Sequence, residues 1–486
     1  MQQKNILKHF TVIGIGTTIN LLLGLISTPI ITRIVDPEKY GQFSMFMTYS
    51  SIAVMVLCIG LDQTLVRYYY MDERIEYKRA LLFKCIIIPL AITLSLGILI
   101  IAINYYCDIE LEFDTRAIIA LCVYTLIKLI YRFSQLLVRL EYNSKLYSTL
   151  NILDKGVYLI VAYILLLVEK TKQLEMLIIA LMVSGVITLV ISVVNQKNIW
   201  SFRSMRLSTC RYTIVELCKY GYPFIFSMGL MTFFQAIDRL SLNMYRNYSE
   251  VGIYASTNSI ISLFAIVQTT FNALWSPLSI EYYTKNPDDK SIYKKANGII
   301  TVLMFAIGIT MILCKDLFAL LLGEKYRGAS YILPFLVFHP IMYTISETTV
   351  CGIVFLKKSK AHIIVTLVAC VSNLIGNTIL VPKLGGQGAA ISTGIAYILF
   401  FTMRTLISNH YYYVDYGLKK FYILTAAVAA YAGICSFVKF NIGSVIGFMI
   451  CIGLLVCFYN ESIKWMVRYV KERVITKLLW RRKNEN

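Results

Sequence analysis

Charged side chains lie inside stretches of this chain that are otherwise apolar enough to cross a lipid bilayer. An ionised group in hydrocarbon is expensive, so it usually faces an aqueous cavity or a partner of opposite charge. Such groups typically mark the path of a solute, an ion or a proton through a membrane protein. The positions are Asp62, Lys128, Arg132, Asp154, Lys155, Asp238, Arg239 and Glu347.

Two of the cations could form one binding surface. Lys128 and Arg132 are four residues apart and share a helix face, with Gln135 at its edge. A cationic face inside a span suits a diphosphate, because Arg binds its oxygens in pairs and Lys supplies a point charge. The alternative is that both cations extend to the cytoplasmic interface or pair with Asp154. We predict five substrate-binding residues: Lys128, Arg132, Asp62, Asp154 and Lys155.

A second set of charges lies where two spans end on the predicted external side. Arg33 closes the first span, and Asp238 and Arg239 close the seventh. In a transporter whose halves separate to open a cavity, such residues would lock the external gate. The alternative is a direct contact with the substrate. We assign all three to gating or coupling.

Glu347 lies in the tenth span, on a helical surface shared with His339 and Tyr343 at steps of four residues. A carboxylate at this depth could carry a proton during coupled transport, and we assign Glu347 to coupling. The alternative is a structural group that is hydrogen-bonded by Ser346, Thr348 or Tyr343.

The composition is that of an integral membrane protein. Of 486 residues, 58% are hydrophobic and 15% are charged, with a mean hydropathy of +0.67, whereas soluble domains are about 45–50% apolar and about 25% charged. The net charge of +20 lies in short clusters between apolar runs, so we expect no nucleic-acid partner. The 12 cysteines lack metal-ligand spacing, and no nucleotide-binding glycine motif occurs. We therefore expect neither a metal nor a cofactor.

Polar breaks divide the chain into about fourteen candidate spans of roughly 20 residues each, which predicts an all-α fold. Lys and Arg concentrate in alternate connections, while the connection at 104–114 has none. The positive-inside rule then places both termini in the cytoplasm. The spans begin near Phe10, Phe43, Ala80, Arg116, Tyr147, Glu175, Tyr220, Val251, Asn297, Tyr331, Ala361, Gly388, Phe421 and Ile442.

The spacing of the spans predicts two lobes and an added C-terminal part. After Glu461 the sequence mixes apolar and basic residues, which is typical of an amphipathic helix on the anionic inner leaflet; the alternative is a solvated tail. The predicted division is 1–200 for an N-terminal lobe of six spans, 201–218 for a cytoplasmic linker, 219–410 for a C-terminal lobe of six spans, 411–460 for spans thirteen and fourteen, and 461–486 for the basic tail.

Two segments share a local pattern that indicates an internal repeat. Each follows a span that ends in Arg, and each opens the next span with a glycine and, two residues later, an aromatic: Gly41 with Phe43, and Gly252 with Tyr254. A parallel repeat of this kind implies two six-helix lobes with a substrate path between them.

At these positions the chain resembles the oligosaccharide (O-antigen and capsule) flippase family of the multidrug/oligosaccharidyl-lipid/polysaccharide exporter superfamily. The resemblance implies translocation of undecaprenyl-diphosphate-linked oligosaccharides across the cytoplasmic membrane by alternating access, for cell-surface polysaccharide synthesis. It also implies membrane lipids, a polysaccharide polymerase and chain-length proteins as partners. The matching stretches are Thr28–Arg33, Pro37–Gly41, Asp238-Arg239, Val251–Tyr254, Leu322–Tyr326 and Leu384–Ala390.

Three other functions fit parts of the pattern. A multidrug or toxin exporter would favour an acidic cavity for cationic substrates, but the charges within the spans are mainly basic. A membrane polysaccharide polymerase or ligase would be expected to have a large external loop, which the sequence lacks. A structural scaffold has little reason to keep so many charges in the membrane. We therefore expect a transporter and not an enzyme.

The topology can be tested with two reporter fusions. Green fluorescent protein fused after Asn486 should fluoresce, and alkaline phosphatase inserted within 104–114 should be active, because the distribution of Lys and Arg places these positions on opposite sides. Finding both positions on one side would contradict the even number of spans.

Overall fold

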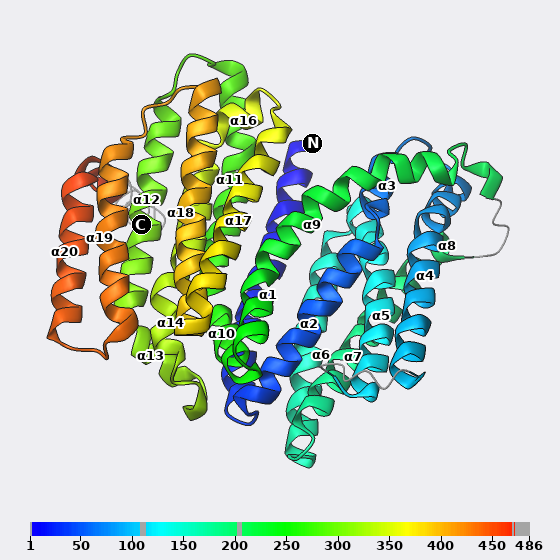
Figure 1. The fold of residues 1–486 in the computed structure, drawn as a ribbon. Helices are drawn as coiled ribbons and strands as arrows, with labels where there is room; N and C mark the ends of the chain where they lie inside the picture. Colours follow the sequence, from blue (N-terminus) through cyan, green and yellow to red (C-terminus); the bar gives the residue numbers. More distant parts are fainter. Residues whose placement is uncertain (1, 107–112, 202–206, 469–470, 472–486) are drawn as a thin grey trace, which may run out of the picture. The chain divides into compact units, whose positions relative to one another are not determined.

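A computed structural model describes residues 2–106, 113–201, 207–468 and 471, and within these ranges the regular structure is entirely helical. The chain divides into two compact units (Figure 1). Unit 1 comprises residues 1–266 together with 322–326, and unit 2 comprises residues 267–321 and 327–486. These packing units differ in extent from the six-span lobes expected from the repeat, which remain a prediction.

Unit 1 contains the helices of the first half of the chain, several of them long enough to cross a bilayer. They are α1 (Gln2–Thr32), α2 (Pro37–Leu57), α3 (Leu61–Tyr68), α4 (Ile75–Tyr106), α5 (Thr115–Leu140), α6 (Ser144–Val168), α7 (Gln173–Asn195), α8 (Lys197–Trp200), η1 (Leu207–Thr209), α9 (Ile214–Tyr245) and α10 (Tyr248–Ile261), with η2 (Glu324–Tyr326) from later in the chain.

Unit 2 contains the remaining helices. They are α11 (Phe264–Lys285), whose first turn belongs to unit 1, α12 (Ser291–Leu313), α13 (Lys315–Leu321), α14 (Ala329–Leu336), α15 (Phe338–Thr349), α16 (Cys351–Phe355), α17 (Ser359–Leu384), α18 (Gly386–Tyr411), α19 (Leu418–Phe437) and α20 (Ile442–Phe458).

The all-α fold is confirmed, and each of the fourteen predicted span starts falls within a helix. The count of fourteen spans is not confirmed. Among the described residues, nine helices are long and apolar enough to cross a membrane, or up to twelve if each of three bent pairs is one span. Part of the difference lies in α9, which contains Lys219, Asp238 and Arg239, and part in α1, whose described apolar segment is only Gly16–Thr32.

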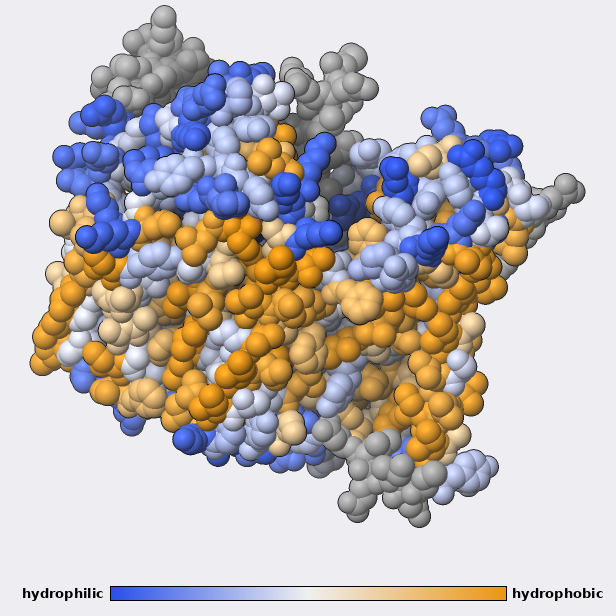
Figure 2. Space-filling view, turned by 45° about the horizontal axis from the view of Figure 1, so that its top comes forward, coloured by the Kyte–Doolittle hydropathy of each residue, from blue (hydrophilic) through white to orange (hydrophobic). Residues whose placement is uncertain are grey.

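Apolar side chains cover the outside of the helices as well as their packed faces. Ile98, Ile160 and Met449 are each more than 60% exposed. On the face shown in Figure 2, hydrophobic residues lie along the middle of the helices and hydrophilic residues gather toward their ends. This distribution is that of a protein whose outer surface contacts hydrocarbon.

Helices α2 and α10 approach each other at two glycines. A Cβ atom added to Gly41 would lie 1.7 Å from the carbonyl oxygen of Tyr248, and one added to Gly252 would lie 2.1 Å from that of Pro37. Each added Cβ would also lie 3.0 Å from the amide nitrogen of the other glycine. The contact is therefore reciprocal, and only glycine permits it. Because the two residues hold equivalent places in the proposed repeat, this geometry supports the repeat.

A segment from much later in the chain packs against the end of α1. The Gly323 amide donates to Thr32 Oγ1 at 3.2 Å, and the Tyr326 hydroxyl donates to the carbonyl oxygen of Val35 at 3.0 Å. Two of the stretches that carry the family resemblance, 28–33 and 322–326, are thus in direct contact within unit 1.

The C-terminal tail lies mostly outside the described residues. Its described beginning, 460–468, is helical and bends by 79° from α20. A helix that turns this sharply from a span is oriented as a surface-lying helix would be.

Substitution of the contact glycines should destabilise unit 1. Gly41→Ala and Gly252→Ala each force backbone apart, and overpacking of this kind costs about 1–3 kcal/mol. We expect a lower midpoint of thermal unfolding in detergent, followed by size-exclusion fluorescence. Gly229→Ala in α9 is the control, because a Cβ there meets nothing within 4 Å. Unchanged midpoints for both contact variants would show that α2 and α10 are further apart than described.

Candidate functional site

A bend between α2 and α3 places Asp62 inside unit 1. The helix axes differ by 54° across the break. Ile59 and Gly60 make the bend with φ values of 50° and 68°, a left-handed conformation that glycine adopts at little cost. A Cβ atom on Gly60 would lie 2.0 Å from the carbonyl oxygen of Gly221, so the bend is packed closely against α9. Asp62 follows in the first turn of α3 and is fully buried.

Arg132 on α5 neutralises this carboxylate. Its Nε and Nη2 atoms donate to Asp62 Oδ2 at 3.0 and 2.5 Å, and the Gln63 side chain donates to the same oxygen at 3.1 Å. Asp62 Oδ1 is buried and has no hydrogen-bond partner among the described residues. The Arg132 side chain is 31% exposed, whereas the Asp62 side chain is fully buried. The ion pair is therefore accessible only from its arginine end.

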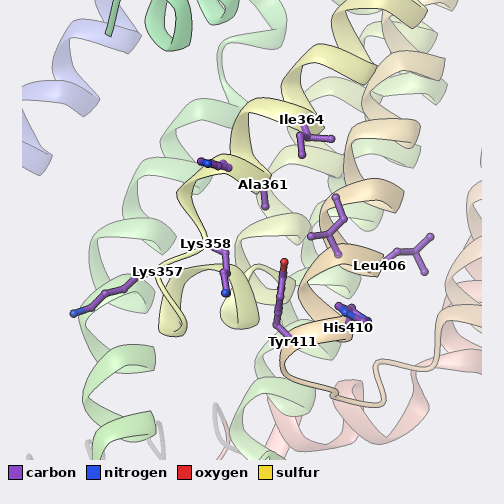
Figure 3. Close-up of a pocket in the computed structure, with 9 residues that line it drawn as sticks. Lys357, Lys358, Ala361, Ile364, Leu406, His410 and Tyr411 are labelled. Atoms are coloured by element: carbon purple, nitrogen blue, oxygen red, sulfur yellow. The ribbon is translucent and has the colours of Figure 1, made fainter. Parts of the chain in front are cut away.

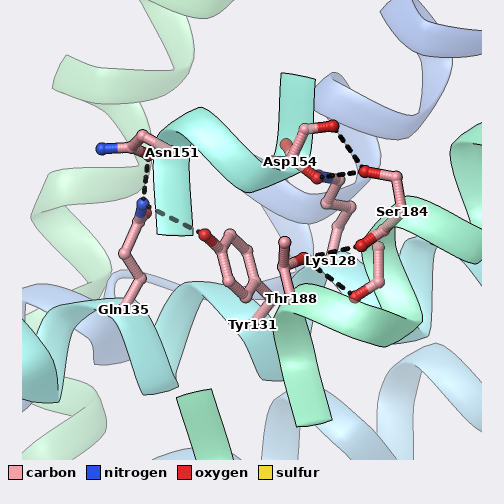
Figure 4. A network of polar contacts seen from close by, with 8 residues as sticks. Lys128, Tyr131, Gln135, Asn151, Asp154, Ser184 and Thr188 are labelled. Carbon is pink, nitrogen blue, oxygen red and sulfur yellow. Dashed lines mark hydrogen bonds and ion pairs between the residues drawn. The ribbon is translucent and has the colours of Figure 1, made fainter. Parts of the chain in front are cut away.

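Lys128, one turn before Arg132, forms a second ion pair with Asp154 on α6. The Lys128 Nζ atom lies 3.2 and 3.1 Å from the two carboxylate oxygens. Ser184 on α7 donates to the Asp154 carbonyl oxygen at 2.6 Å and to its Oδ1 at 3.0 Å (Figure 4). The ammonium also lies over the rings of Tyr124 and Tyr131, 5.5 and 5.3 Å from their centroids. Lys128 thus makes the ion pair with Asp154 that is the alternative to a substrate contact.

Polar groups continue along the same face of α5. Gln135 donates to Asn151 Oδ1 on α6 at 2.8 Å and lies 3.5 Å from the Tyr131 hydroxyl (Figure 4). Lys155 follows Asp154 on α6, is partly buried and lies within electrostatic range of Asp154 and Lys128. In the part of the chain that the structure describes, its ammonium makes no hydrogen bond or ion pair.

The five predicted substrate-binding residues therefore gather in one unit, on α3, α5 and α6. We call them the N-terminal charge cluster: Asp62, Lys128, Arg132, Asp154 and Lys155. The cluster holds one more cation than carboxylate. A surplus positive charge among partly buried groups attracts an anion, and both its Arg and its Lys side chains can donate to phosphate oxygens.

The predicted gate residues in α9 bind two different helices. The Tyr254 hydroxyl on α10 donates to Asp238 Oδ2 at 2.6 Å, and Arg239 Nη1 donates to Thr48 Oγ1 on α2 at 3.1 Å. Arg33 lies just beyond α1, is exposed, and makes no ion pair or hydrogen bond with the described residues. The structure thus joins Asp238 and Arg239 to the helices that meet at the two glycines but leaves Arg33 apart.

Glu347 in unit 2 forms an ion pair with Arg404 on α18. Arg404 Nη1 lies 2.8 Å from Glu347 Oε1 and donates to Ser346 Oγ at 2.7 Å. The guanidinium also lies 5.8 and 5.5 Å from the ring centroids of Tyr343 and Phe400. The Glu347 and Arg404 side chains are 20% and 8% exposed, so a positive partner compensates a partly buried carboxylate.

Sequence reasoning missed Arg404 and Ser184. Arg404 carried a usable signal, because it is a charge within the apolar segment 386–411. Ser184 carried none, since a serine inside a span usually bonds its own helix backbone.

Comparisons with known proteins agree with this fold. The chain matches the structure of the lipid II flippase MurJ in an inward closed conformation with a TM-score of 0.69, at 15% identity, over 95% of this chain and 99% of that one. An inward-facing multidrug resistance transporter of the MATE family, of the MOP superfamily, matches with a TM-score of 0.64, at 15% identity, over 80% of this chain and 94% of that one. An uncharacterized membrane protein of Methanocaldococcus jannaschii is 22% identical over 76% of this chain and 77% of its own length.

The chain is therefore a multi-pass membrane protein with the fold of the MOP-superfamily flippases and transporters. More particularly, it belongs to the family described as polysaccharide biosynthesis protein, whose family model matches residues 6–283. The expectation of a transporter and not an enzyme agrees with these relatives, since the matching structures are those of a flippase and a multidrug transporter.

The Glu347–Arg404 pair can be tested by a double-mutant cycle. Arg404→Gln leaves a partly buried carboxylate uncompensated and should cost at most about 3–5 kcal/mol, the loss seen for fully buried pairs. Glu347→Gln with Arg404→Gln keeps two neutral hydrogen-bonding groups and should recover most of that loss. Denaturant unfolding in micelles measures the free energy of unfolding of the single and the double variant. Lys294→Gln is the control, because its pair with Asp415 has side chains 62% and 63% exposed and should matter little. A double variant no more stable than Arg404→Gln would argue that the two side chains do not act as a pair.

Proposed function

We propose that this protein is a flippase that moves undecaprenyl-diphosphate-linked oligosaccharides across the cytoplasmic membrane for the synthesis of cell-surface polysaccharide. Membership of the polysaccharide biosynthesis protein family supports the process, and the similarity of fold to the lipid II flippase supports the type of transport. The N-terminal charge cluster is the observation that carries the choice of substrate class.

The cluster has the chemistry that a lipid-linked diphosphate needs. Lys128 and Arg132 lie one turn apart on α5, and Lys155 adds a third cation that has no partner among the described residues. A diphosphate offers several charged oxygens and could accept from all three, with the Arg132 guanidinium binding in bidentate fashion. A cationic drug would instead be repelled by the surplus positive charge.

The two carboxylates explain how the site remains stable without substrate. Asp62 and Asp154 neutralise Arg132 and Lys128, which would otherwise be unpaired in a low-dielectric region. An arriving diphosphate would replace the carboxylates as the partner of the cations. Binding is then an exchange of ion pairs, and release restores the internal pairs, so the same cations need not hold the product tightly.

We also propose alternating access between the lobes 1–200 and 219–410, with Asp238 and Arg239 at the gate and Glu347 and Arg33 in gating or coupling. Two contacts support the role of α9, because Asp238 bonds α10 and Arg239 bonds α2. A change of state that separates those helices would break one of these bonds. An inner-membrane location with both termini cytoplasmic, and partnership with a polymerase and chain-length proteins, are part of the same proposal.

Charge removal at the cluster tests the proposal. Lys128→Gln with Arg132→Gln should lower glycan export roughly tenfold or more at equal protein abundance, since two charge-assisted contacts to the diphosphate are lost. The measurement is complementation of a deletion strain, with mass spectrometry of the lipid-linked intermediates that accumulate. Lys170→Gln with Lys172→Gln is the matched control, because both lysines are exposed between α6 and α7.

Two outcomes would contradict the proposal. One is full export by the cluster variant. The other is a deletion strain that accumulates no lipid-linked glycan but becomes sensitive to cationic drugs, which would favour a multidrug exporter.

A further inference from the structure

A pocket in unit 2 lies where the turn after α16 meets the end of α18. Its volume is about 910 Å³. None of the residues that line it is acidic, and four of them are Lys or His. The lining residues are Lys357, Lys358, Lys360, Ala361, Ile364, Leu406, Ile407, His410 and Tyr411.

The topology places this pocket at one end of two spans. Helices α17 and α18 pack side by side and are joined at Gly385, so the start of α17 and the end of α18 lie at the same end of the hairpin. The apolar segments 360–384 and 386–411 each qualify as a membrane span. The pocket therefore lies where the hydrocarbon layer gives way to the polar head groups.

The basic side of the pocket is arranged around Lys358 and Tyr411. The Lys358 ammonium lies 5.3 Å from the centroid of the Tyr411 ring, and the two side chains lie next to each other between the helices, while Lys357 extends away from them (Figure 3). Lys360 and His410 add further donors from α17 and α18. No hydrogen bond or ion pair occupies the ammonium of Lys358 or Lys360 among the described residues.

The other side of the pocket is apolar and belongs to the outer surface of the spans. Ile364 and Leu406 are 50% and 52% exposed, and further along α17 the apolar side chains of Leu367 and Val371 are also about half exposed. An apolar surface of this kind on a spanning helix contacts acyl chains. The pocket thus has cationic side chains at one end and an apolar surface that can contact an acyl chain at the other.

We propose that this pocket binds an anionic membrane phospholipid, with the phosphodiester between Lys358, Lys360 and His410 and an acyl chain against Ile364 and Leu406. Basic pockets between spanning helices suit phosphate head groups in this way. The occupant is a lipid of the surrounding bilayer and not the transported substrate, because the apolar wall is the exposed surface of α17 and α18 within unit 2. Such a lipid would tie the turn at Lys357, whose φ of 54° is unfavourable for a non-glycine residue, to the end of α18.

Delipidated full-length protein in a neutral detergent tests the site. Added dioleoyl-phosphatidylglycerol should raise the thermal midpoint, and native mass spectrometry should show bound lipid, whereas dioleoyl-phosphatidylcholine should do neither. Lys358→Gln with Lys360→Gln should weaken the binding of phosphatidylglycerol roughly ten- to thirty-fold. The reason is that each of the two lysines contributes an approximately equal factor to the affinity for an anionic lipid, and the two factors multiply. Lys419→Gln with Lys420→Gln is the matched control, since both are exposed at the start of α19.

A second variant separates lipid from a free anion. Leu406→Trp fills the apolar wall and keeps every charge, so it should also lose phosphatidylglycerol, and it remains informative if the lysine variant fails to fold. Inorganic pyrophosphate should stabilise none of the proteins. Equal lipid binding by the two lysine variants would overturn the proposal, as would stabilisation by pyrophosphate that the Leu406→Trp variant retains.

Discussion

A charge within the hydrocarbon layer must find an opposite charge, hydrogen bonds or water, and this constraint organises unit 1. Lys128 and Arg132 leave α5 one turn apart and need two carboxylates from other helices. Asp154 comes from α6 and is held by Ser184 of α7. Asp62 reaches its partner because the chain bends at Gly60. The bend at Gly60 and the hydroxyl on α7 thus both position carboxylates for two partly buried cations of α5.

Both units contain ion pairs within their helices, but the two sets of pairs differ in exposure. In unit 2, Arg404 and Glu347 form a pair with little exposure and aromatic rings on the guanidinium, so little of this pair is accessible to a ligand. In unit 1 the Arg132 side chain remains partly exposed and Lys155 has no partner among the described residues. The more accessible pair, in unit 1, is therefore the one whose cation can exchange its carboxylate for a ligand.

The sequence predicted local features well and pairings poorly. Apolar runs are local, so each predicted span start falls within a helix. Breaks such as the one at Gly60 depend on packing against α9, which no local pattern specifies. Charges inside apolar runs identified the cluster residues, but the partner of Arg132 lies 70 positions away, and no local pattern specifies that distance. The pattern at Gly41 and Gly252 was visible, yet their mutual contact is a property of two packed helices.

Residues 322–326 belong to unit 1 although they are synthesised long after the rest of it. Unit 1 can therefore complete its folding only late in synthesis. The hydrogen bond between Gly323 and Thr32 spans 291 residues, which a ribosome working at about 5–20 residues per second needs roughly 15–60 s to synthesise. During that interval the early helices reside in the bilayer without their hydrogen bonds to Gly323 and Tyr326. The cations of α5, however, have their carboxylate partners within the first 154 residues of the chain. The cations of α5 can therefore be neutralised early in biogenesis, whereas unit 1 is completed only after residues 322–326 have been synthesised.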